Sequence, residues 1–223
     1  MRISAVIFDV DGTLLDTERM YMEAWRQAAK MQGFEMDEEY LLNTRAVNKA
    51  EVLKIWDKYY PDQSYEKTWQ IRVELAEKWL SELEDSDSIL KKGCRKLLDW
   101  LDEKGIKKAT ASSTTKERND LHLKEAGLLG RFEVMIGGDM VSRGKPHPDS
   151  FLLAAGKLGV DPAECIVCED SRAGIEAAHN AGMIPVFIKD CVPANDMVNE
   201  FAKYQPADLS EVISIIEEIN GRN

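Results

Sequence analysis

Hydrophobic runs about as long as a β-strand recur along this 223-residue chain, and most of them precede a helical pattern. The runs lie at residues 3–8, 108–112, 132–136, 165–168 and 184–188. Helical patterns lie at residues 18–32, 116–126, 148–158 and 171–181, and from residue 210 onward. Alternating strands and helices with continuously apolar strands are typical of a parallel sheet covered on both faces. The sequence therefore predicts an α/β core.

Residues 17–84 interrupt this alternation, because they carry helical periodicity and contain no convincing strand. Two hydrophobic stripes at helical spacing run through Val52, Ile55 and Trp56 and through Trp69, Val73 and Leu80. Four of the five tryptophans of the chain lie in this stretch, enough for a small core of its own. We therefore expect an all-helical domain at 17–86, inserted into a catalytic core formed by 1–16 and 87–223.

The charge balance narrows the possible partners. Forty acidic residues against 29 basic ones give a formal charge of −11, which disfavours binding to nucleic acid. No run approaches the roughly 18 apolar residues that a membrane helix needs, and no secretion signal is evident. We expect a cytoplasmic protein, without a membrane partner, that acts as a monomer.

The four cysteines fit a reducing compartment. Cys165 and Cys168 form a CxxC pattern, which is found in metal and redox sites. Here they lie on a predicted buried strand, where residues three apart point to opposite faces. We therefore interpret the cysteines, Cys94 and Cys191 included, as buried and inert.

Polar residues that can carry chemistry follow the predicted strands. Ligands of open α/β sheets bind beyond the carboxyl ends of the strands. The residues expected at this edge are Asp9, Asp11 and Thr13, then Ser112 and Ser113, then Lys145, and finally Glu169 and Asp170. Clustered carboxylates make an all-oxygen site that suits Mg²⁺, while the lysine, the serines and nearby amides suit a phosphate group. The edge can therefore hold a divalent cation and a phosphate together.

Four ordered motifs resemble those of the haloacid dehalogenase superfamily. The first is Phe8-Asp-Val-Asp-Gly-Thr-Leu-Leu-Asp16, and residues 110–113, 144–149 and 168–175 resemble the others. The helical insertion is similar to the C1 cap of the β-phosphoglucomutase-like phosphatases. The resemblance implies a Rossmann-like parallel sheet core with an inserted all-helical cap.

The resemblance also assigns roles to the residues. Asp9 is the expected nucleophile that forms an aspartyl-phosphate, and Asp11 is the expected general acid and base. Thr13 would position this pair, while Ser112, Ser113 and Lys145 would bind the phosphoryl group. The expected Mg²⁺ ligands are Asp9, Asp170 and the main-chain carbonyl of Asp11, with Glu169 bound directly or through water.

The implied reaction is Mg²⁺-dependent hydrolysis of a small phosphorylated metabolite, either a sugar phosphate or a nucleoside monophosphate. Dehalogenases lack an acid two residues after the nucleophile, so Asp11 favours phosphoryl transfer. A β-phosphoglucomutase-type mutase is the alternative, and a non-enzymatic phospho-acceptor module is a third possibility. The mutase carries a histidine where this chain has Tyr21, and an arginine that aligns with Lys49.

The insertion contributes candidate substrate contacts at Thr17, Tyr21, Arg45, Lys49 and Arg72. Solvent-facing helix positions are the alternative interpretation of the three basic residues. His122 and His179 lie on predicted helices without a second histidine four residues away, so we expect both to be structural or solvated. His147 lies between two prolines and is expected to belong to a rigid loop.

Overall fold

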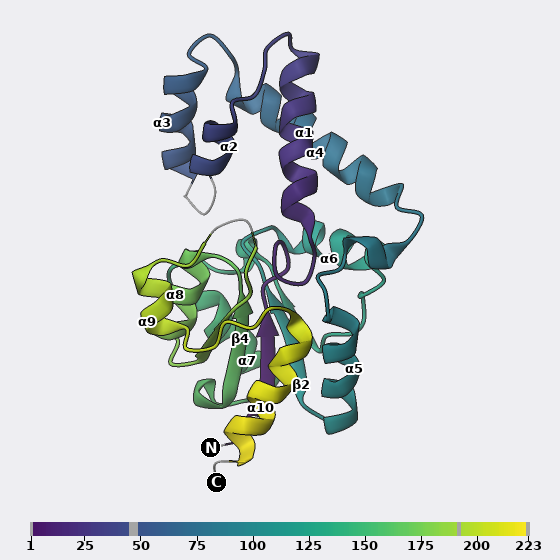
Figure 1. Cartoon of the computed structure of the whole chain (residues 1–223), viewed down its shortest axis with the longest axis vertical. Coiled ribbons are helices and arrows are strands. Elements are labelled where there is room, and N and C mark those ends of the chain that lie inside the picture. The colour runs from purple at the N-terminus through teal and green to yellow at the C-terminus, as the bar shows by residue number, and fades with distance from the viewer. Residues whose placement is uncertain (1, 45–48, 191–192, 222–223) are drawn as a thin grey trace. The chain divides into compact units, whose positions relative to one another are not determined.

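Five parallel strands form the sheet of the computed structural model, which describes residues 2–44, 49–190 and 193–221, without the side chains of 42, 43, 49 and 50. Their order across the sheet is β3-β2-β1-β4-β5 (Figure 1). The strands are β1 (Ala5–Phe8), β2 (Lys107–Ala111), β3 (Val134–Ile136), β4 (Cys165–Glu169) and β5 (Ile184–Phe187). This parallel sheet confirms the predicted α/β class.

The register of the central strand aligns the strand ends. Phe8, the last residue of β1, pairs with Thr110 of β2 and with Cys168 of β4. The residues that follow Phe8 in the chain therefore leave the sheet beside the ends of β2 and β4. The candidate motifs converge on one edge for this reason.

Helices connect the strands and cover the sheet on both faces (Figure 1). The α-helices of this part are α5 (Cys94–Lys104), α6 (Lys116–Glu125), α7 (Asp149–Leu158), α8 (Arg172–Asn180), α9 (Asp196–Phe201) and α10 (Val212–Gly221). Short 3₁₀ turns lie between them: η1 (Ser86–Ile89), η2 (Gly138–Met140), η3 (Pro162–Glu164) and η4 (Leu209–Glu211).

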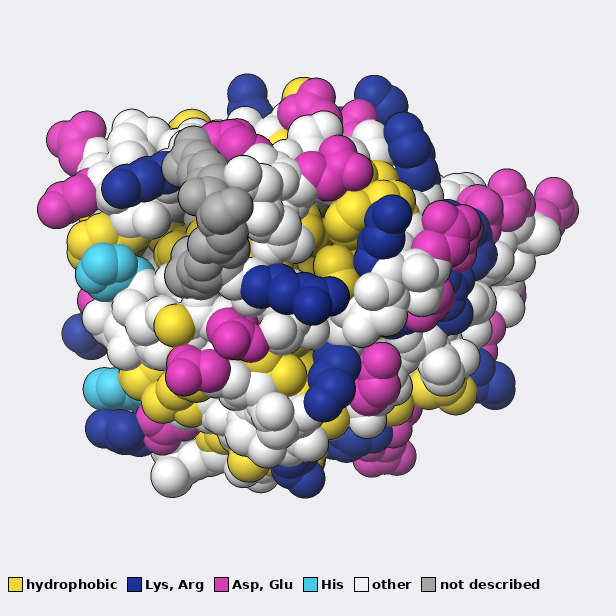
Figure 2. Space-filling model, turned by 90° about the horizontal axis from the view of Figure 1, so that it is seen from below, with side chains coloured by type: hydrophobic (Ala, Val, Ile, Leu, Met, Phe, Trp, Pro, Cys, Tyr) yellow, Lys and Arg dark blue, Asp and Glu magenta, His cyan; other side chains and the backbone are white. Residues whose placement is uncertain are grey.

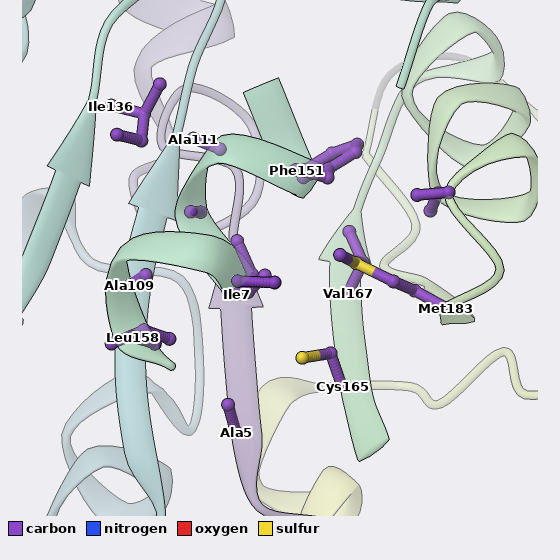
Figure 3. Packing of buried hydrophobic residues seen from close by; sticks show 14 of the residues in the cluster. Ala5, Ile7, Ala109, Ala111, Ile136, Phe151, Leu158, Cys165, Val167 and Met183 are labelled. Carbon is purple, nitrogen blue, oxygen red and sulfur yellow. The ribbon is translucent and has the colours of Figure 1, made fainter. Parts of the chain in front are cut away.

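The two faces of the sheet bury different sets of helices. On one face, alternate strand residues such as Ile7 and Val167 pack against Phe151 of α7 (Figure 3). Ala178 of α8 belongs to the same buried cluster. On the other side, α5 packs against β2 and α10. Because both faces are covered, β1, β3 and β5 carry only apolar residues and appear as continuous hydrophobic runs in the sequence. The exceptions are β2, which begins with two lysines and contains Thr110, and β4, which ends on Glu169.

Residues 17–84 form a separate compact unit, while 1–16 and 85–223 form the other. The boundary at 84/85 lies two residues before the expected one, because Asp85 already caps η1 through its side chain. The inserted unit is all-helical, with α1 (Thr17–Met31), α2 (Glu38–Asn43), α3 (Lys49–Tyr59) and α4 (Tyr65–Ser81).

Aromatic rings make up most of the core of the inserted unit. Trp56 is 1 % exposed and packs against Trp25, Tyr40 and Tyr60, with ring centroids 6.0, 5.5 and 4.7 Å away. Its indole Nε1 donates to the Gln63 carbonyl oxygen at 2.9 Å, so its polar atom is also satisfied. Burying such large side chains gives this short helical unit a core of its own.

Acidic and basic side chains are interspersed over the face of the molecule in Figure 2, so neither sign of charge dominates that view. Within the described ranges, no helix is both long enough and apolar enough to cross a bilayer.

Candidate active site

Three carboxylates meet where β1 and β4 end. Asp9 directly follows β1, Glu169 is the last residue of β4, and Asp170 comes next. The Asp9 N–H donates to the Cys168 carbonyl oxygen at 3.0 Å, which extends the pairing of the two strands up to the site. One oxygen from each of the three carboxylates lies within 4.8 Å of the others.

Lys145 lies between two of these carboxylates. Its Nζ donates to Asp9 Oδ1 at 2.6 Å and to Glu169 Oε1 at 2.7 Å. The Lys145 side chain is 6 % exposed, so both ion pairs are shielded from water. Removing one partner of a buried ion pair strongly destabilises the folded protein, because the remaining charge is left uncompensated. Lys145 therefore fixes the position of Asp9.

Burial has opposite effects on the two members of this pair. Desolvation raises the pKa of Asp9 to about 7, which Lys145 opposes and Glu169 and Asp11 reinforce. Desolvation also lowers the pKa of Lys145, but the Asp9 and Glu169 charges outweigh it and hold the pKa of Lys145 above its usual value. Lys145 is thus a permanent cation, and further positive charge near Asp9 would favour its ionised form.

Glu169 is held in place at both of its oxygens. Oε1 accepts from Lys145, and Oε2 accepts from the Ser171 N–H at 2.6 Å. Ser171 is the N-cap of α8, where its hydroxyl accepts from the Gly174 N–H. A Cβ on Gly174 would overlap the Glu169 carboxylate, so only glycine fits at this turn of the helix.

Asp170 is oriented by the first motif. The buried Thr13 hydroxyl donates to Asp170 Oδ1 at 3.0 Å. Gly12 has a φ of +83°, and a Cβ there would overlap Asp170 Oδ2. The turn after β1 therefore approaches Asp170 closely, and glycine permits both the backbone conformation and the approach.

Ser112 and Ser113 leave β2 beside this cluster. Ser112 is buried at the strand end, its N–H donates to the Ile136 carbonyl oxygen at 3.1 Å, and its Oγ accepts from the Thr114 N–H at 3.0 Å. Ser113 is exposed. The chain therefore turns at the end of β2 with two serine hydroxyl groups, next to the strand that leads to Asp9.

Two neighbours of Asp11 have no counterpart among the predicted site residues. The Thr114 hydroxyl donates to Asp11 Oδ2 at 3.2 Å, and His122 Nδ1 lies 3.4 Å from Asp11 Oδ1. The His122 side chain is 1 % exposed, so it is not solvated. An isolated histidine on a helix gives no periodic signal, and only the fold brings α6 beside the turn after β1.

The donor set fits a hard divalent cation. Asp9, Glu169 and Asp170 offer only oxygen atoms, the ligands that Mg²⁺ prefers over sulfur or imidazole nitrogen. Asp170 and Asp9 are the residues best able to hold such an ion, since both oxygens of Glu169 already accept hydrogen bonds.

The candidate residues of the inserted unit are placed only in part. Thr17 begins α1, and Tyr21 lies one turn later on the same helix. The Arg72 guanidinium of α4 lies 3.9 Å from the centroid of the Tyr21 ring, a cation–π contact within the unit. Arg45 lies outside the described residues, and Lys49 begins α3 with its side chain outside them.

Comparison with known proteins agrees with these features. The model of the haloacid dehalogenase-like hydrolases matches residues 6–188. A phosphorylated carbohydrates phosphatase of Thermotoga maritima is 35% identical over 186 residues, which cover 83% of this chain and 84% of the relative. A β-phosphoglucomutase of Bacillus subtilis is 29% identical over 190 residues and covers 82% of each chain.

A solved structure is also similar. The crystal structure of CbbY from Rhodobacter sphaeroides in complex with xylulose 1,5-bisphosphate has a TM-score of 0.76 and 25% identity. The match covers 94% of this chain and 96% of that one. The family match spans all four motifs, from the residues before Asp9 to those beyond Asp170. The chain belongs to the haloacid dehalogenase-like hydrolases.

Proposed function

We propose that this protein is a Mg²⁺-dependent phosphatase that hydrolyses small phosphomonoesters through an aspartyl-phosphate on Asp9. The observation that carries the proposal is the buried Asp9 carboxylate, held 2.6 Å from the Lys145 ammonium beside Glu169 and Asp170. A carboxylate fixed in this way can act as a nucleophile, and a cation next to it can attract an anionic substrate.

In the first half of the proposed reaction, an Asp9 carboxylate oxygen attacks the phosphorus atom. The bond between phosphorus and the leaving oxygen breaks, and that oxygen takes a proton from the Asp11 carboxyl group. In the second half, Asp11, now a carboxylate, takes a proton from water, and the water oxygen attacks the phosphorus. The bond to Asp9 breaks, releasing inorganic phosphate and restoring both side chains.

The remaining core residues have supporting roles in this scheme. Lys145 and the Ser112 and Ser113 turn would bind the phosphoryl oxygens, and Thr13 would hold Asp170 in place. Asp9, Asp170 and the main-chain carbonyl of Asp11 would hold the Mg²⁺ ion, with Glu169 beside them directly or through water. When bound, the ion supplies positive charge that offsets the repulsion between Asp9 and the phosphoryl group.

Sugar phosphates are the substrate class that the relatives favour, since the Thermotoga maritima relative is named for phosphorylated carbohydrates. Nucleoside monophosphates are the second class. Within the inserted unit, Thr17, Tyr21, Arg45, Lys49 and Arg72 are the proposed source of selectivity. The partner is thus a small phosphorylated metabolite rather than nucleic acid or a membrane, and we propose that the enzyme acts as a cytoplasmic monomer.

A phosphomutase is the second candidate, favoured by the similarity to the Bacillus subtilis β-phosphoglucomutase. Tyr21 argues against it, because a phenol ring in contact with Arg72 replaces the histidine of the mutases. The two functions differ in the acceptor, which is water in the phosphatase and a sugar hydroxyl in the mutase.

Phosphate release from a panel of sugar phosphates, nucleoside monophosphates and pyrophosphate tests the proposal. We expect Mg²⁺-dependent release that EDTA abolishes and that added Mg²⁺ restores. Asp9→Asn should lower the rate by at least about 10³-fold, because it removes the nucleophile while keeping its shape. Circular dichroism of this variant should match the wild type.

Two outcomes would contradict the phosphatase. The first is phosphate release by Asp9→Asn at the wild-type rate. The second is conversion of β-glucose 1-phosphate to glucose 6-phosphate without release of phosphate, which would establish the mutase instead.

A further inference from the structure

The carboxylate of Asp11 is held at both of its oxygens by side chains that follow β2. Thr114, in the loop before α6, donates to Oδ2 at 3.2 Å, and His122, on α6, places Nδ1 3.4 Å from Oδ1. These two contacts come from opposite ends of the carboxylate. Together they restrain the rotation of the carboxyl plane about χ2 more than either contact does alone.

His122 is a costly residue to bury on this helix. Its side chain is 1 % exposed on α6, and its neighbour Leu123 is fully buried. Burying a polar ring without a partner costs about 1–3 kcal/mol. The Asp11 carboxylate, 16 % exposed, lies 3.4 Å from His122 Nδ1 and is a polar partner that offsets this cost.

Orientation matters for Asp11 more than for the other acids of the site. In the proposed function, on which this inference rests, Asp11 must deliver a proton to the leaving oxygen and later take one from water. Proton transfer requires the carboxyl oxygen to lie within hydrogen-bond reach of the reacting oxygen. A carboxyl group free to rotate would meet this condition for only part of the time.

We propose that His122 is a positioning residue for the acid–base step: its imidazole holds the Asp11 carboxyl group in the orientation that protonates the leaving group. Thr114 holds the opposite oxygen. Neither residue touches the substrate in this scheme, and both act only through Asp11.

The proposal predicts an effect that depends on the leaving group. p-Nitrophenolate leaves phosphorus readily without a proton, whereas phenolate is a poorer leaving group that benefits from one. A defect in the orientation of Asp11 should therefore slow phenyl phosphate much more than p-nitrophenyl phosphate. These two substrates differ by one nitro group, which separates leaving-group chemistry from recognition of a sugar.

The variants are His122→Ala, which removes the contact, and His122→Asn, whose side-chain amide can donate from nearly the position of Nδ1. We expect His122→Ala to lower kcat/KM for phenyl phosphate by about tenfold or more and for p-nitrophenyl phosphate by less than about threefold. The loss should fall on kcat, with KM unchanged. His122→Asn should recover most of the rate.

Two further variants make the test independent of folding defects. Thr114→Val keeps the shape of the side chain but removes its hydroxyl, and should shift the substrate ratio in the same direction. The control is Asn119→Ala. Asn119 lies one turn before His122, is equally buried and has no contact with Asp11 among the described hydrogen bonds and ion pairs. It should leave the substrate ratio at the wild-type value.

Equal losses for both substrates in His122→Ala and Thr114→Val would overturn the positioning role, as would wild-type rates for both substrates in these variants. A shifted ratio in Asn119→Ala would overturn it too, because the effect would then belong to the helix. Failure of the proposed function has a different signature: the wild type would release phosphate neither from these two substrates nor from the sugar phosphates and nucleoside monophosphates, or Asp9→Asn would hydrolyse them at the wild-type rate.

Discussion

At the scale of the residue, the charge of Lys145 organises the site. Its ammonium group touches Asp9 and Glu169, two carboxylates that would otherwise repel each other at the ends of neighbouring strands. The phosphoryl group that the proposed function brings to Asp9 is also an anion. A single buried cation therefore stabilises both the resting cluster and the approach of substrate.

The residues that gather at the candidate site were predictable from sequence where they belong to a recognisable motif. Asp9, Asp11 and Asp170 follow strand ends and Lys145 lies in the loop before α7, in the order of the motifs that resemble those of the superfamily. The contact between His122 and Asp11 was not predictable, since it depends on the side-chain orientation of α6 and on the turn after β1. Sequence reasoning assigned His122 a structural or solvated role, and the burial of its side chain excludes the solvated one.

Thiol chemistry tests the burial of the described cysteines, since Cys191 lies outside the residues that the structure describes. Burial raises the pKa of Cys94 and of Cys165 to about 12, from a usual value of 9.0. A raised pKa favours the neutral thiol, so at pH 8 only about 10⁻⁴ of each group is the reactive thiolate. We expect iodoacetamide to leave both residues unmodified in the native protein, as peptide mass spectrometry would detect.

The control is the same reaction in guanidinium chloride, where unfolding restores the usual pKa and both cysteines should be alkylated. Alkylation of Cys165 in the native protein at pH 8 would contradict its burial on β4. It would also reopen the possibility of redox chemistry in the CxxC pattern.

At the scale of the element, the start of α8 holds the site together. Its N-cap Ser171 donates its main-chain N–H to Glu169, and its hydroxyl accepts from Gly174. The helix begins where β4 ends, so the cap and the carboxylate share a single turn of chain. The packing of this turn leaves no room for a side chain at Gly174.

Gly174→Ala should therefore displace the Glu169 carboxylate from Lys145. We expect the variant to lose about 1–3 kcal/mol of unfolding free energy, as overpacking usually costs, and at least about tenfold in phosphatase activity. Guanidinium denaturation and phosphate release measure the two effects.

Gly156→Ala on α7 is the matched control, because no atom lies within 4 Å of its added Cβ. This helical substitution should raise the unfolding free energy by about 0.5–1 kcal/mol and leave activity unchanged. If Gly174→Ala behaved like Gly156→Ala, the tight packing around Glu169 would be disproved.

Helices and strands were predictable from sequence where the local pattern of hydrophobic residues indicates them. The hydrophobic run at 165–168 became β4 and the pattern at 171–181 became α8, each within a residue or two at its ends. The helix α9 escaped prediction because its six residues are too short for a periodic stripe. The helix α5 was also missing from the prediction, although Leu97, Leu98 and Leu101 form a buried stripe at helical spacing. The strand order could not be read from the chain, since pairing is a long-range property of the folded sheet.

At the scale of the whole molecule, the chain combines two compact units with different kinds of core. Residues 17–84 pack largely through aromatic rings, while the rest packs through aliphatic strands and helices. The carboxylates, Lys145 and the neighbours of Asp11 all belong to the second unit. The chemistry proposed here therefore resides in the sheet-containing unit, and the helical unit is left as the proposed source of selectivity.

The net charge of −11 is compatible with an anionic substrate at this scale. Four of the 40 acidic residues, at positions 9, 11, 169 and 170, gather at the candidate site. Local cations rather than net charge would decide whether phosphate binds there. Net charge is therefore uninformative about small phosphorylated ligands.

The most direct test of the central claim is mass spectrometry of enzyme quenched in acid during turnover of p-nitrophenyl phosphate with Mg²⁺. We expect the peptide that contains Asp9 to gain the mass of one phosphoryl group, and borohydride treatment before digestion to convert Asp9 to homoserine. Asp9→Asn should show neither change. Turnover by the wild type with the phosphoryl group on another residue, or with none trapped while Asp9→Asn remains active, would contradict the account.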